Sequence, residues 1–259
     1  IFKELSELRP DDIELRAAVA HSWLLKQDYT GAAAVFESVF KGSDSLSVDD
    51  QVRFGQIFFN FVQQDSAVVP YAEKLFQTIR ERFPDDWRPY LFLGALANTT
   101  GSDSAALGYF GKVKELAEWI PDGWMGVAAV YYDAGNFAEA INVLNEAKKF
   151  VPDEFRLHFL LGISSQRAGR RAEAATALER AIQLNEKSVD ARSALALVYD
   201  ELGQKAESDS LYEQALRIDP DNHQVLNNYG YSLAERGLQL ERALKMAESA
   251  VAQHPENQS

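Results

Sequence analysis

The 259-residue chain contains no cysteine, which excludes disulfide bridges, thiolate metal sites and cysteine nucleophiles. Long apolar runs are also missing. The longest runs, such as residues 90–97, are far too short to cross a bilayer, so we expect no membrane insertion. Basic residues are fewer than acidic ones, 26 against 39, and the formal net charge is −13. Such a chain repels nucleic acid and anionic membrane surfaces at long range and favours a basic or neutral partner.

Motifs that carry catalysis or bind cofactors are missing as well. The chain has no G-x-x-x-x-G-K-[ST] phosphate loop, no G-x-S-x-G nucleophile elbow and no H-E-x-x-H zinc helix. Its four histidines lie far apart in sequence, and no two share a helix face at metal-ligand spacing. The basic pair Arg170-Arg171 has no interleaved aromatic residues and is interpreted as a solvated turn. We therefore expect no enzymatic activity, no catalytic residue, no cofactor, no metal ion and no nucleic-acid partner.

What the chain does contain is an internal repeat. Its clearest marks are five glycines, each 34 residues after the last: Gly101, Gly135, Gly169, Gly203 and Gly237. Between these glycines, apolar residues recur at steps of three and four, which is typical of helices with one buried face. Each unit is thus predicted to be a helix, a tight turn at glycine and a second helix. Polar pairs such as Asp85-Asp86 precede the first helix and can accept hydrogen bonds from its free N–H groups.

Small residues mark where the two helices of each unit touch, once positions 1 to 34 are counted from residues 13, 53, 87, 121, 155, 189 and 223. Position 8 holds Ala20, Asn60, Gly94, Ala128, Gly162, Ala196 and Gly230. Position 20 holds Ala32, Ala72, Ala106, Ala140, Ala174, Ser208 and, after a one-residue insertion, Ala243. Large side chains at either position would push the helices apart. This register, with an aromatic residue or leucine at most positions 24, resembles that of the tetratricopeptide repeat (TPR) family.

The resemblance covers nearly the whole chain and implies an all-α fold. It predicts a right-handed superhelical solenoid of antiparallel helix-turn-helix hairpins, seven repeats and a leading half-repeat, in one array over residues 1–259. The expected boundaries are 1–10 for the trailing helix of a preceding repeat, 13–46 for repeat 1, 47–52 for a loop, 53–86 for repeat 2, 87–120 for repeat 3, 121–154 for repeat 4, 155–188 for repeat 5, 189–222 for repeat 6 and 223–257 for repeat 7.

One interruption of the register precedes the second repeat. The first unit starts at residue 13 and the second at residue 53, a step of 40 residues instead of 34. The extra residues fall in the turn-rich stretch 42–49, which is interpreted as a longer loop or, alternatively, as a bend that reorients the first repeat. The second unit also has Asn60 at the small position and no glycine turn.

In TPR proteins the first helix of each repeat lines a concave face, where positions 2, 5, 9, 12 and 13 contact ligands. The resemblance therefore implies a groove for a peptide or protein segment, and the chain is expected to act as a scaffold or adaptor. The residues expected to line this groove are Phe54, Ile57, Phe61, Leu91, Asn98, Met125, Tyr132, Phe159, Ile163, Arg167, Asn227 and Tyr231. The terminal-carboxylate clamp of chaperone-binding TPR domains is not expected, because only Asn228 matches its residue pattern.

The alternative function is that of a self-associating structural or envelope-assembly element, which would use the ends or the convex face. Leu244, Ala247 and Val251 would face a next helix that the sequence does not contain, so the chain is interpreted as a fragment with uncapped terminal helices. A monomeric sedimentation profile at high concentration would exclude self-association through them. Residues 226–236 are similar to a segment of bacterial TPR proteins, some of them envelope lipoproteins. We expect a bacterial protein of the cytoplasm or the periplasm, with the envelope favoured.

Overall fold

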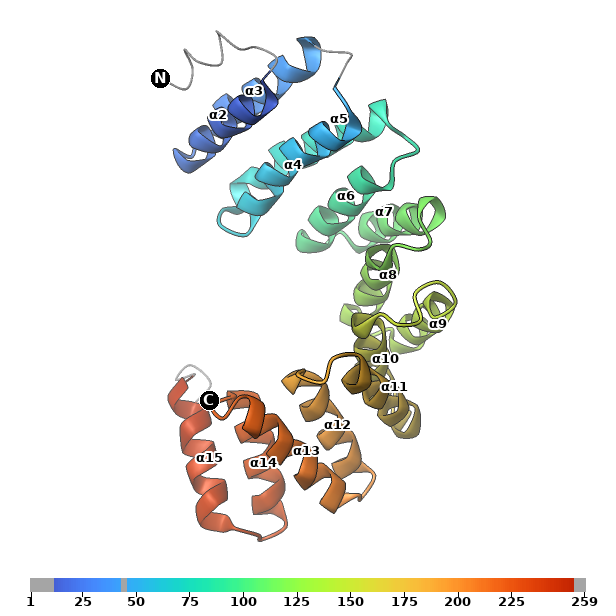
Figure 1. Cartoon of the computed structure of the whole chain (residues 1–259), viewed down its shortest axis with the longest axis vertical. Coiled ribbons are helices and arrows are strands. Elements are labelled where there is room, and N and C mark those ends of the chain that lie inside the picture. The colour runs from blue at the N-terminus through green and yellow to red at the C-terminus, as the bar shows by residue number, and fades with distance from the viewer. Residues whose placement is uncertain (1–11, 43–45, 254–259) are drawn as a thin grey trace. The chain divides into compact units, whose positions relative to one another are not determined.

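The computed structural model describes residues 12–42 and 46–253, and all regular structure within these ranges is helical. The all-α fold predicted from the repeat is thereby confirmed, and Figure 1 shows the helices in chain order. They are α2 (Ile13–Leu25), α3 (Tyr29–Gly42), α4 (Val48–Val62), the short 3-10 helix η1 (Ser66–Val68), α5 (Val69–Arg82), α6 (Trp87–Thr99), α7 (Asp103–Leu116), α8 (Pro121–Asp133), α9 (Phe137–Ala147), α10 (Phe155–Arg167), α11 (Arg171–Leu184), α12 (Val189–Glu201), α13 (Lys205–Ile218), α14 (His223–Glu235) and α15 (Leu240–Gln253). The trailing helix expected over residues 1–10 lies outside the described residues.

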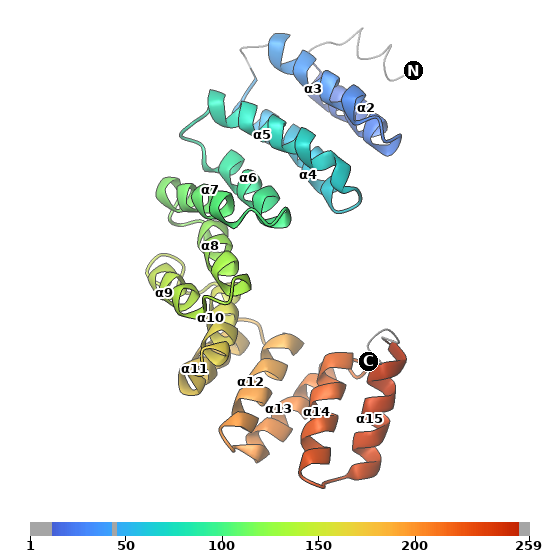
Figure 2. The same cartoon turned by 180° about the vertical axis from the view of Figure 1, so that it is seen from behind.

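The helices pair into hairpins, beginning with α2–α3 and ending with α14–α15, and the view from behind in Figure 2 shows the two helices of a hairpin running antiparallel. We call the earlier member of each pair the first helix and the later member the second helix. The chain divides into two compact units, Ile1–Val127 and Ala128–Ser259. Unit 1 contains the hairpins up to α6–α7, and unit 2 contains those from α10–α11 onward.

The turn glycines predicted from their 34-residue spacing all adopt the left-handed backbone conformation. Their φ angles are 70° at Gly101, 75° at Gly135, 75° at Gly169, 77° at Gly203 and 66° at Gly237. This conformation ends a helix and reverses the chain, and only glycine adopts it without a steric penalty. The corresponding turn between α2 and α3 is formed by Gln27, whose φ of 59° is unusual for a residue with a side chain.

Close contact between the helices of a hairpin depends on glycine facing a large residue. A Cβ atom on Gly162 of α10 would lie 2.5 Å from Cγ of Leu178 on α11. The equivalent atom on Gly94 of α6 would lie 2.8 Å from the ring of Phe110 on α7. No real Cβ atom sits that close, so these glycines set the distance between the helices.

The loop predicted over residues 47–52 is wrong, because α4 already begins at Val48. Oγ of Ser47 accepts a hydrogen bond from the backbone N–H of Asp50 at 3.2 Å, and Asp49 and Asp50 place negative charge on the first turn. The sequence predicts residues 47–50 as part of a turn-rich stretch, whereas in the structure they form the N-terminal cap and first turn of α4. Helix α4 ends at Val62, and six residues separate it from α5.

The inserted residues therefore lie inside the second hairpin, between its two helices. The short helix η1 occupies the connection, where the Asp65 carboxylate accepts a hydrogen bond from Ala67 N at 2.9 Å and another from the Tyr29 hydroxyl. The second correction follows from this shift. The small residue that faces α5 is Gly55, whose added Cβ would lie 2.7 Å from the Phe76 ring, whereas the predicted Asn60 is exposed.

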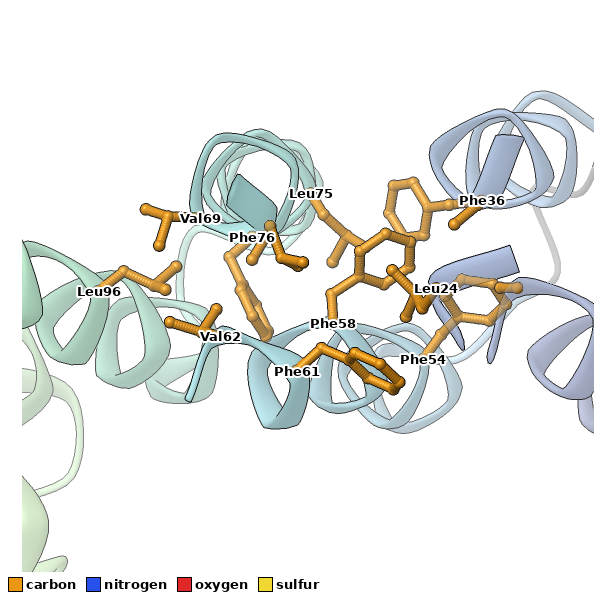
Figure 3. Packing of buried hydrophobic residues seen from close by; sticks show 14 of the residues in the cluster. Leu24, Phe36, Phe54, Phe58, Phe61, Val62, Val69, Leu75, Phe76 and Leu96 are labelled. Carbon is orange, nitrogen blue, oxygen red and sulfur yellow. The ribbon is translucent and has the colours of Figure 1, made fainter. Parts of the chain in front are cut away.

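Aromatic side chains fill the core around this hairpin, as Figure 3 shows for the labelled phenylalanines. The rings of Phe36 and Phe54 have centroids 5.5 Å apart, and those of Phe54 and Phe58 are 6.2 Å apart. On the other side of α5, Phe76 stacks on Phe92 at 4.5 Å. Rings of this size bury large apolar areas and favour such offset or tilted contacts.

All four tryptophans belong to unit 1: Trp23, Trp87, Trp119 and Trp124. Trp124 is 2% exposed, donates from Nε1 to the Glu118 carbonyl oxygen at 2.8 Å, and has the Lys114 ammonium 4.0 Å from its ring centroid. Trp119, in the connection between α7 and α8, is 63% exposed. The two indoles thus occupy opposite environments within one unit.

Candidate functional site

Unit 2 contains a hollow of about 640 Å³ along its first helices. It is lined by Tyr132, Phe159, Ile163, Gln166, Arg167, Gly169, Arg171, Asp190, Ser193, Ala194, Leu197, Glu201, Gln224 and Asn228. These residues come from α8, α10, α12 and α14, together with the turn into α11 and its first residue. We call this hollow the unit 2 groove. The first helices of four successive repeats therefore contribute to it.

The floor of the groove is apolar and only partly covered by the protein itself. Phe159 and Ile163 lie four residues apart on α10 and share one helix face, and Arg167 continues that face to the end of the helix. Leu197 of the next first helix is 37% exposed. The Phe159 ring stacks on Phe155 at 5.8 Å, which fixes its orientation. The floor thus offers large apolar side chains that a bound segment can cover.

One rim of the groove is held by a charged contact between neighbouring repeats. The Glu201 carboxylate accepts hydrogen bonds from Gln166 Nε2 and from Arg171 Nε, both at 2.8 Å. This contact joins α10, α11 and α12. The sequence predicts Arg171 as a solvated turn residue. Its side chain is 48% exposed, and it additionally pairs with Glu201 at this rim. Sequence spacing could not reveal it, since its partner is 30 residues away.

The second groove arginine has an aromatic support in place of a carboxylate. The guanidinium carbon of Arg167 lies 5.2 Å from the ring centroid of Phe137 on α9. Phe137 in turn packs edge-on against Tyr132, with centroids 5.4 Å apart. A cation–π contact of this kind does not use the N–H donors of the guanidinium, so they stay available for hydrogen bonds.

Two further polar groups line the groove on α12. Ser193 is 4% exposed, and its Oγ has no hydrogen-bond partner among the described residues. This Oγ atom is itself almost fully covered by the protein, so it adds little to the exposed lining of the groove. Asp190 is exposed in the first turn of the same helix, where the helix dipole favours its negative charge.

The structure brings four of the residues predicted for the groove together: Tyr132, Phe159, Ile163 and Arg167. In α14 the residues expected from the sequence differ from those that line the hollow. Gln224 and Asn228 line the hollow, whereas Asn227 and Tyr231 are exposed and do not line it. Tyr231 is 70% exposed. The face of α14 that turns toward the groove therefore starts at position 2 and continues at position 6, not at position 5.

The residues predicted for the groove in unit 1 do not form an open surface. Phe54, Phe61 and Met125 are buried, at 2%, 8% and 9% exposure, and this corrects their assignment to an open face. The shift of α4 explains the two phenylalanines, because counting from Val48 instead of Arg53 moves them to the core side of the helix. The remaining three, Ile57, Leu91 and Asn98, are partly buried.

Helix α15 presents apolar side chains to solvent. Leu240 is 59% exposed, Leu244 is 61% exposed and Val251 is 41% exposed. Ala247 is exposed on the same helix. Self-association through this helix stays a prediction, because no partner chain is present.

Charged and aromatic side chains also join α13, α14 and α15 behind the groove. Glu213 accepts hydrogen bonds from Arg242 Nη1 at 2.6 Å and from the Tyr229 hydroxyl at 3.0 Å. The bond from Arg242 holds the pKa of Glu213 below its usual value, although partial burial opposes this. Burial, assisted by Glu213, raises the pKa of Tyr229 to about 12. Both groups therefore keep their hydrogen-bonding states across the physiological pH range.

No group of three or more His, Asp or Glu residues suited to a metal ion occurs in residues 12–42 and 46–253. His158 is 7% exposed, and its Nε2 lies 2.7 Å from the Pro152 carbonyl oxygen, a contact that fastens the start of α10. His254 lies outside the described residues. None of the described helices is long and apolar enough to cross a membrane.

Comparison with known sequences identifies this architecture. Two family models, each described as a tetratricopeptide repeat, match residues 128–183 and 159–223 in one case and 211–245 in the other. Over 85 residues the chain is 35% identical to the type IV pilus assembly protein PilF of Pseudomonas aeruginosa. This alignment covers 32% of this chain and 34% of PilF. Over 114 residues the chain is 26% identical to tetratricopeptide repeat protein 7B of Homo sapiens, and this alignment covers 44% of this chain and 14% of that protein.

Solved structures give the same fold. YrrB, described as a TPR protein with an unusual peptide-binding site, is 24% identical with a TM-score of 0.57, covering 70% of this chain and 93% of YrrB. The structure of Pseudomonas aeruginosa PilF has a TM-score of 0.67 at 15% identity, covering 80% of this chain and 92% of that one.

The helix hairpins and the groove along their first helices define a class of protein, the helical repeat scaffolds, whose TPR members are generally non-catalytic. The chain belongs to the tetratricopeptide repeat family. TPR proteins are scaffolds for protein–protein interaction, so the partners that this fold implies are proteins. The matched regions span between 14% and 34% of the length of the curated relatives.

Proposed function

We propose that the chain is an adaptor that holds an extended or helical segment of another protein in the unit 2 groove. The observation that carries this proposal is the hollow of about 640 Å³ whose apolar floor is shared by first helices of successive repeats. Pockets that bind ligands combine partly exposed apolar anchors with a few convergent polar groups. Phe159, Ile163 and Leu197 supply the anchors, and Arg167 and Asn228 supply polar groups.

The named relatives support the same kind of activity. PilF is a protein of type IV pilus assembly, and YrrB has a peptide-binding site. A role in bringing components of a larger assembly together is consistent with both, and an envelope location follows the PilF relationship. The groove of this chain would then recognise one segment of such a component.

The test uses a displayed library of random peptides, each about 16 residues long, selected on the purified chain. Sixteen residues span up to about 53 Å when extended, enough to cross several first helices. Enriched peptides are synthesised and titrated against the wild-type chain and against Leu197→Glu. A charge on the apolar floor desolvates unfavourably, so we expect binding at least tenfold weaker.

Leu202→Glu is the matched control. Leu202 is 40% exposed, close to the 37% of Leu197, but lies in the following turn and does not line the groove. We expect its affinity for the same peptides to equal that of the wild type. The proposal fails if no peptide is enriched, or if both glutamate variants bind the selected peptides as the wild type does.

A further inference from the structure

We infer that the segment bound in the unit 2 groove is anchored by a carboxylate on Arg167, beside an apolar side chain on the groove floor. This inference rests on the proposed function and names the chemistry of the partner. The bound segment would carry an Asp, a Glu or its own C-terminal carboxylate at this end of the groove. Toward Asp190, at the other end, it would carry a neutral or basic residue.

Two arginines, Arg167 and Arg171, line the groove. Arg171 already has a carboxylate partner, because its Nε donates to Glu201 at 2.8 Å. Arg167 has none in the described part of unit 2, and its contact is with the Phe137 ring. The groove therefore retains one cation without a counter-charge.

The position of Arg167 prepares it for a carboxylate. The Arg167 guanidinium already lies over the Phe137 ring, which is itself in edge contact with Tyr132, before any ligand binds. A planar guanidinium presents paired N–H donors that match the two oxygens of a carboxylate. Because the contact with Phe137 already limits where the guanidinium lies, less conformational entropy is lost when the ion pair forms.

The neighbouring acid does not oppose this pairing. Both oxygens of Glu201 accept hydrogen bonds, one from Gln166 and one from Arg171, so its charge is balanced at the rim. Glu201 is thereby held away from the role of partner to Arg167. An incoming carboxylate meets a rim whose own acid is already neutralised.

Asp190 places a negative charge at the end of the groove opposite Arg167. Arg167 is the last residue of α10, whereas Asp190 is the second residue of α12, so the two charges lie at opposite ends of neighbouring first helices. Eleven helical residues separate these positions within a repeat, which corresponds to about 16 Å along the helix axis. An extended peptide covers that distance in about five residues. A partner with an acid at one end and no acid about five residues away fits this charge pattern.

The test is a double-mutant cycle on peptides selected with the library described above. Each Asp or Glu of a selected peptide is changed to Asn or Gln, and a C-terminal amide replaces the terminal carboxylate. Every peptide is titrated against the wild type, Arg167→Gln and the control Arg170→Gln. Arg170 carries the same charge three residues away, lies outside the groove and pairs with Glu173 at 3.6 Å.

We expect one acidic group of each selected peptide to determine its affinity for the groove. Neutralising it, or making Arg167→Gln, should each weaken binding about tenfold at low salt, and the two changes together should weaken it no further. Arg170→Gln should bind like the wild type. Circular dichroism and thermal unfolding of Arg167→Gln show whether the variant folds normally.

Two outcomes separate this inference from the function on which it rests. If Leu197→Glu abolishes binding while Arg167→Gln leaves every peptide unaffected, the groove binds peptides but the carboxylate anchor is wrong. If acidic peptides bind and their affinity drops equally with Arg167→Gln and Arg170→Gln, only long-range charge is at work, and the anchor is again wrong. If neither groove variant changes binding, the proposed function itself fails.

Discussion

The two units of this chain build the same helix hairpin from different side chains. In unit 2 the turns repeat every 34 residues at glycine, and Gly162 packs against the aliphatic Leu178. In unit 1 the α2–α3 turn uses Gln27, and Gly55 packs against the ring of Phe76. The family models match residues 128–245, which belong to unit 2. In both units the hairpin depends on a small residue facing a large one, and the side chains that meet this need can differ.

The insertion in unit 1 shows how much irregularity a hairpin tolerates. The connection between α4 and α5 is longer than that in the other hairpins, yet Gly55 still reaches Phe76 and the phenylalanine core is continuous around it. Surface connections can lengthen at little thermodynamic cost, because loop-closure entropy grows slowly with length. The contact inside the hairpin cannot change in the same way, because it is close-packed.

The largest effect is expected at the close contact in α4. Gly55→Val should destabilise the hairpin by about 2–3 kcal/mol, because the new side chain meets the rings and methyl groups of α5. Asn60→Val, at the exposed position predicted from the sequence, should change stability by no more than about 0.5 kcal/mol. Urea denaturation combined with amide hydrogen exchange in α4 and α5 measures both. A larger loss for Asn60→Val would restore the register with its start at Arg53.

A smaller effect is expected from exchanging the turn residues of the two units. Gln27→Gly should stabilise the first hairpin by about 1 kcal/mol, since glycine adopts positive φ without strain. Gly169→Gln should destabilise unit 2 by a similar amount. Nothing lies within 4 Å of a Cβ atom at Gly169, so the backbone conformation alone is tested.

Thermal unfolding and hydrogen exchange at the flanking helices measure the two turn variants. Gly108→Ala serves as the control for glycine in a helix, because Gly108 also has free space around its Cβ position but does not have a positive φ. It should stabilise α7 by about 0.5–1 kcal/mol. If Gln27→Gly destabilises the chain, the equivalence of the turns in the two units is wrong.

The smallest effect is expected from the titration of Glu213 in unit 2. The pKa of Glu213 is lowered by Arg242, so its contribution to stability is present above the ordinary value of 4.5 and is lost as the pH falls through the lower folded value. The side chain is 37% exposed, and water screening limits the contribution to less than about 1 kcal/mol. Glu213→Gln should therefore weaken α13–α15 near neutral pH.

This difference between Glu213→Gln and the wild type should shrink in an acidic buffer well below the ordinary pKa of 4.5, as the wild-type carboxylate becomes protonated. Urea denaturation at both pH values, followed by hydrogen exchange in α13–α15, measures it. Unit 1 contains none of these groups and should show no difference at either pH. An unchanged difference at low pH would mean that Glu213 acts through packing and not through its charge.

Sequence periodicity predicted the parts of the fold that local chemistry determines. Turn glycines and the glycine or alanine at the helix contact recur because every hairpin needs them, and Gly162 and Gly169 were assigned correctly. The start of α4 was missed because Ser47 and the acids after it read equally as a turn and as a helix cap. Because repeat positions were counted from Arg53 and not from Val48, Phe54 and Phe61 were predicted on the open groove face, whereas both are buried in the core.

The groove was predicted in outline and missed in detail for a related reason. Helix spacing places Phe159, Ile163 and Arg167 on one face, and the structure finds them there. The roles of Arg171 and Phe137 depend on partners in neighbouring helices, which spacing within one helix does not reveal. Single positions within a repeat are therefore predictable, whereas contacts between repeats require the folded chain.

The confinement of the four tryptophans to unit 1 provides a built-in optical label. Selective excitation of indole observes unit 1 alone, with Trp124 as an enclosed fluorophore and Trp119 as a solvated one. A quencher such as iodide should dim Trp119 first and reach Trp124 only when unit 1 opens. Unit 2 contains tyrosine but no tryptophan. If a test peptide carries a tryptophan and binds to unit 2, the indole fluorescence of the protein that accompanies the peptide signal comes entirely from unit 1.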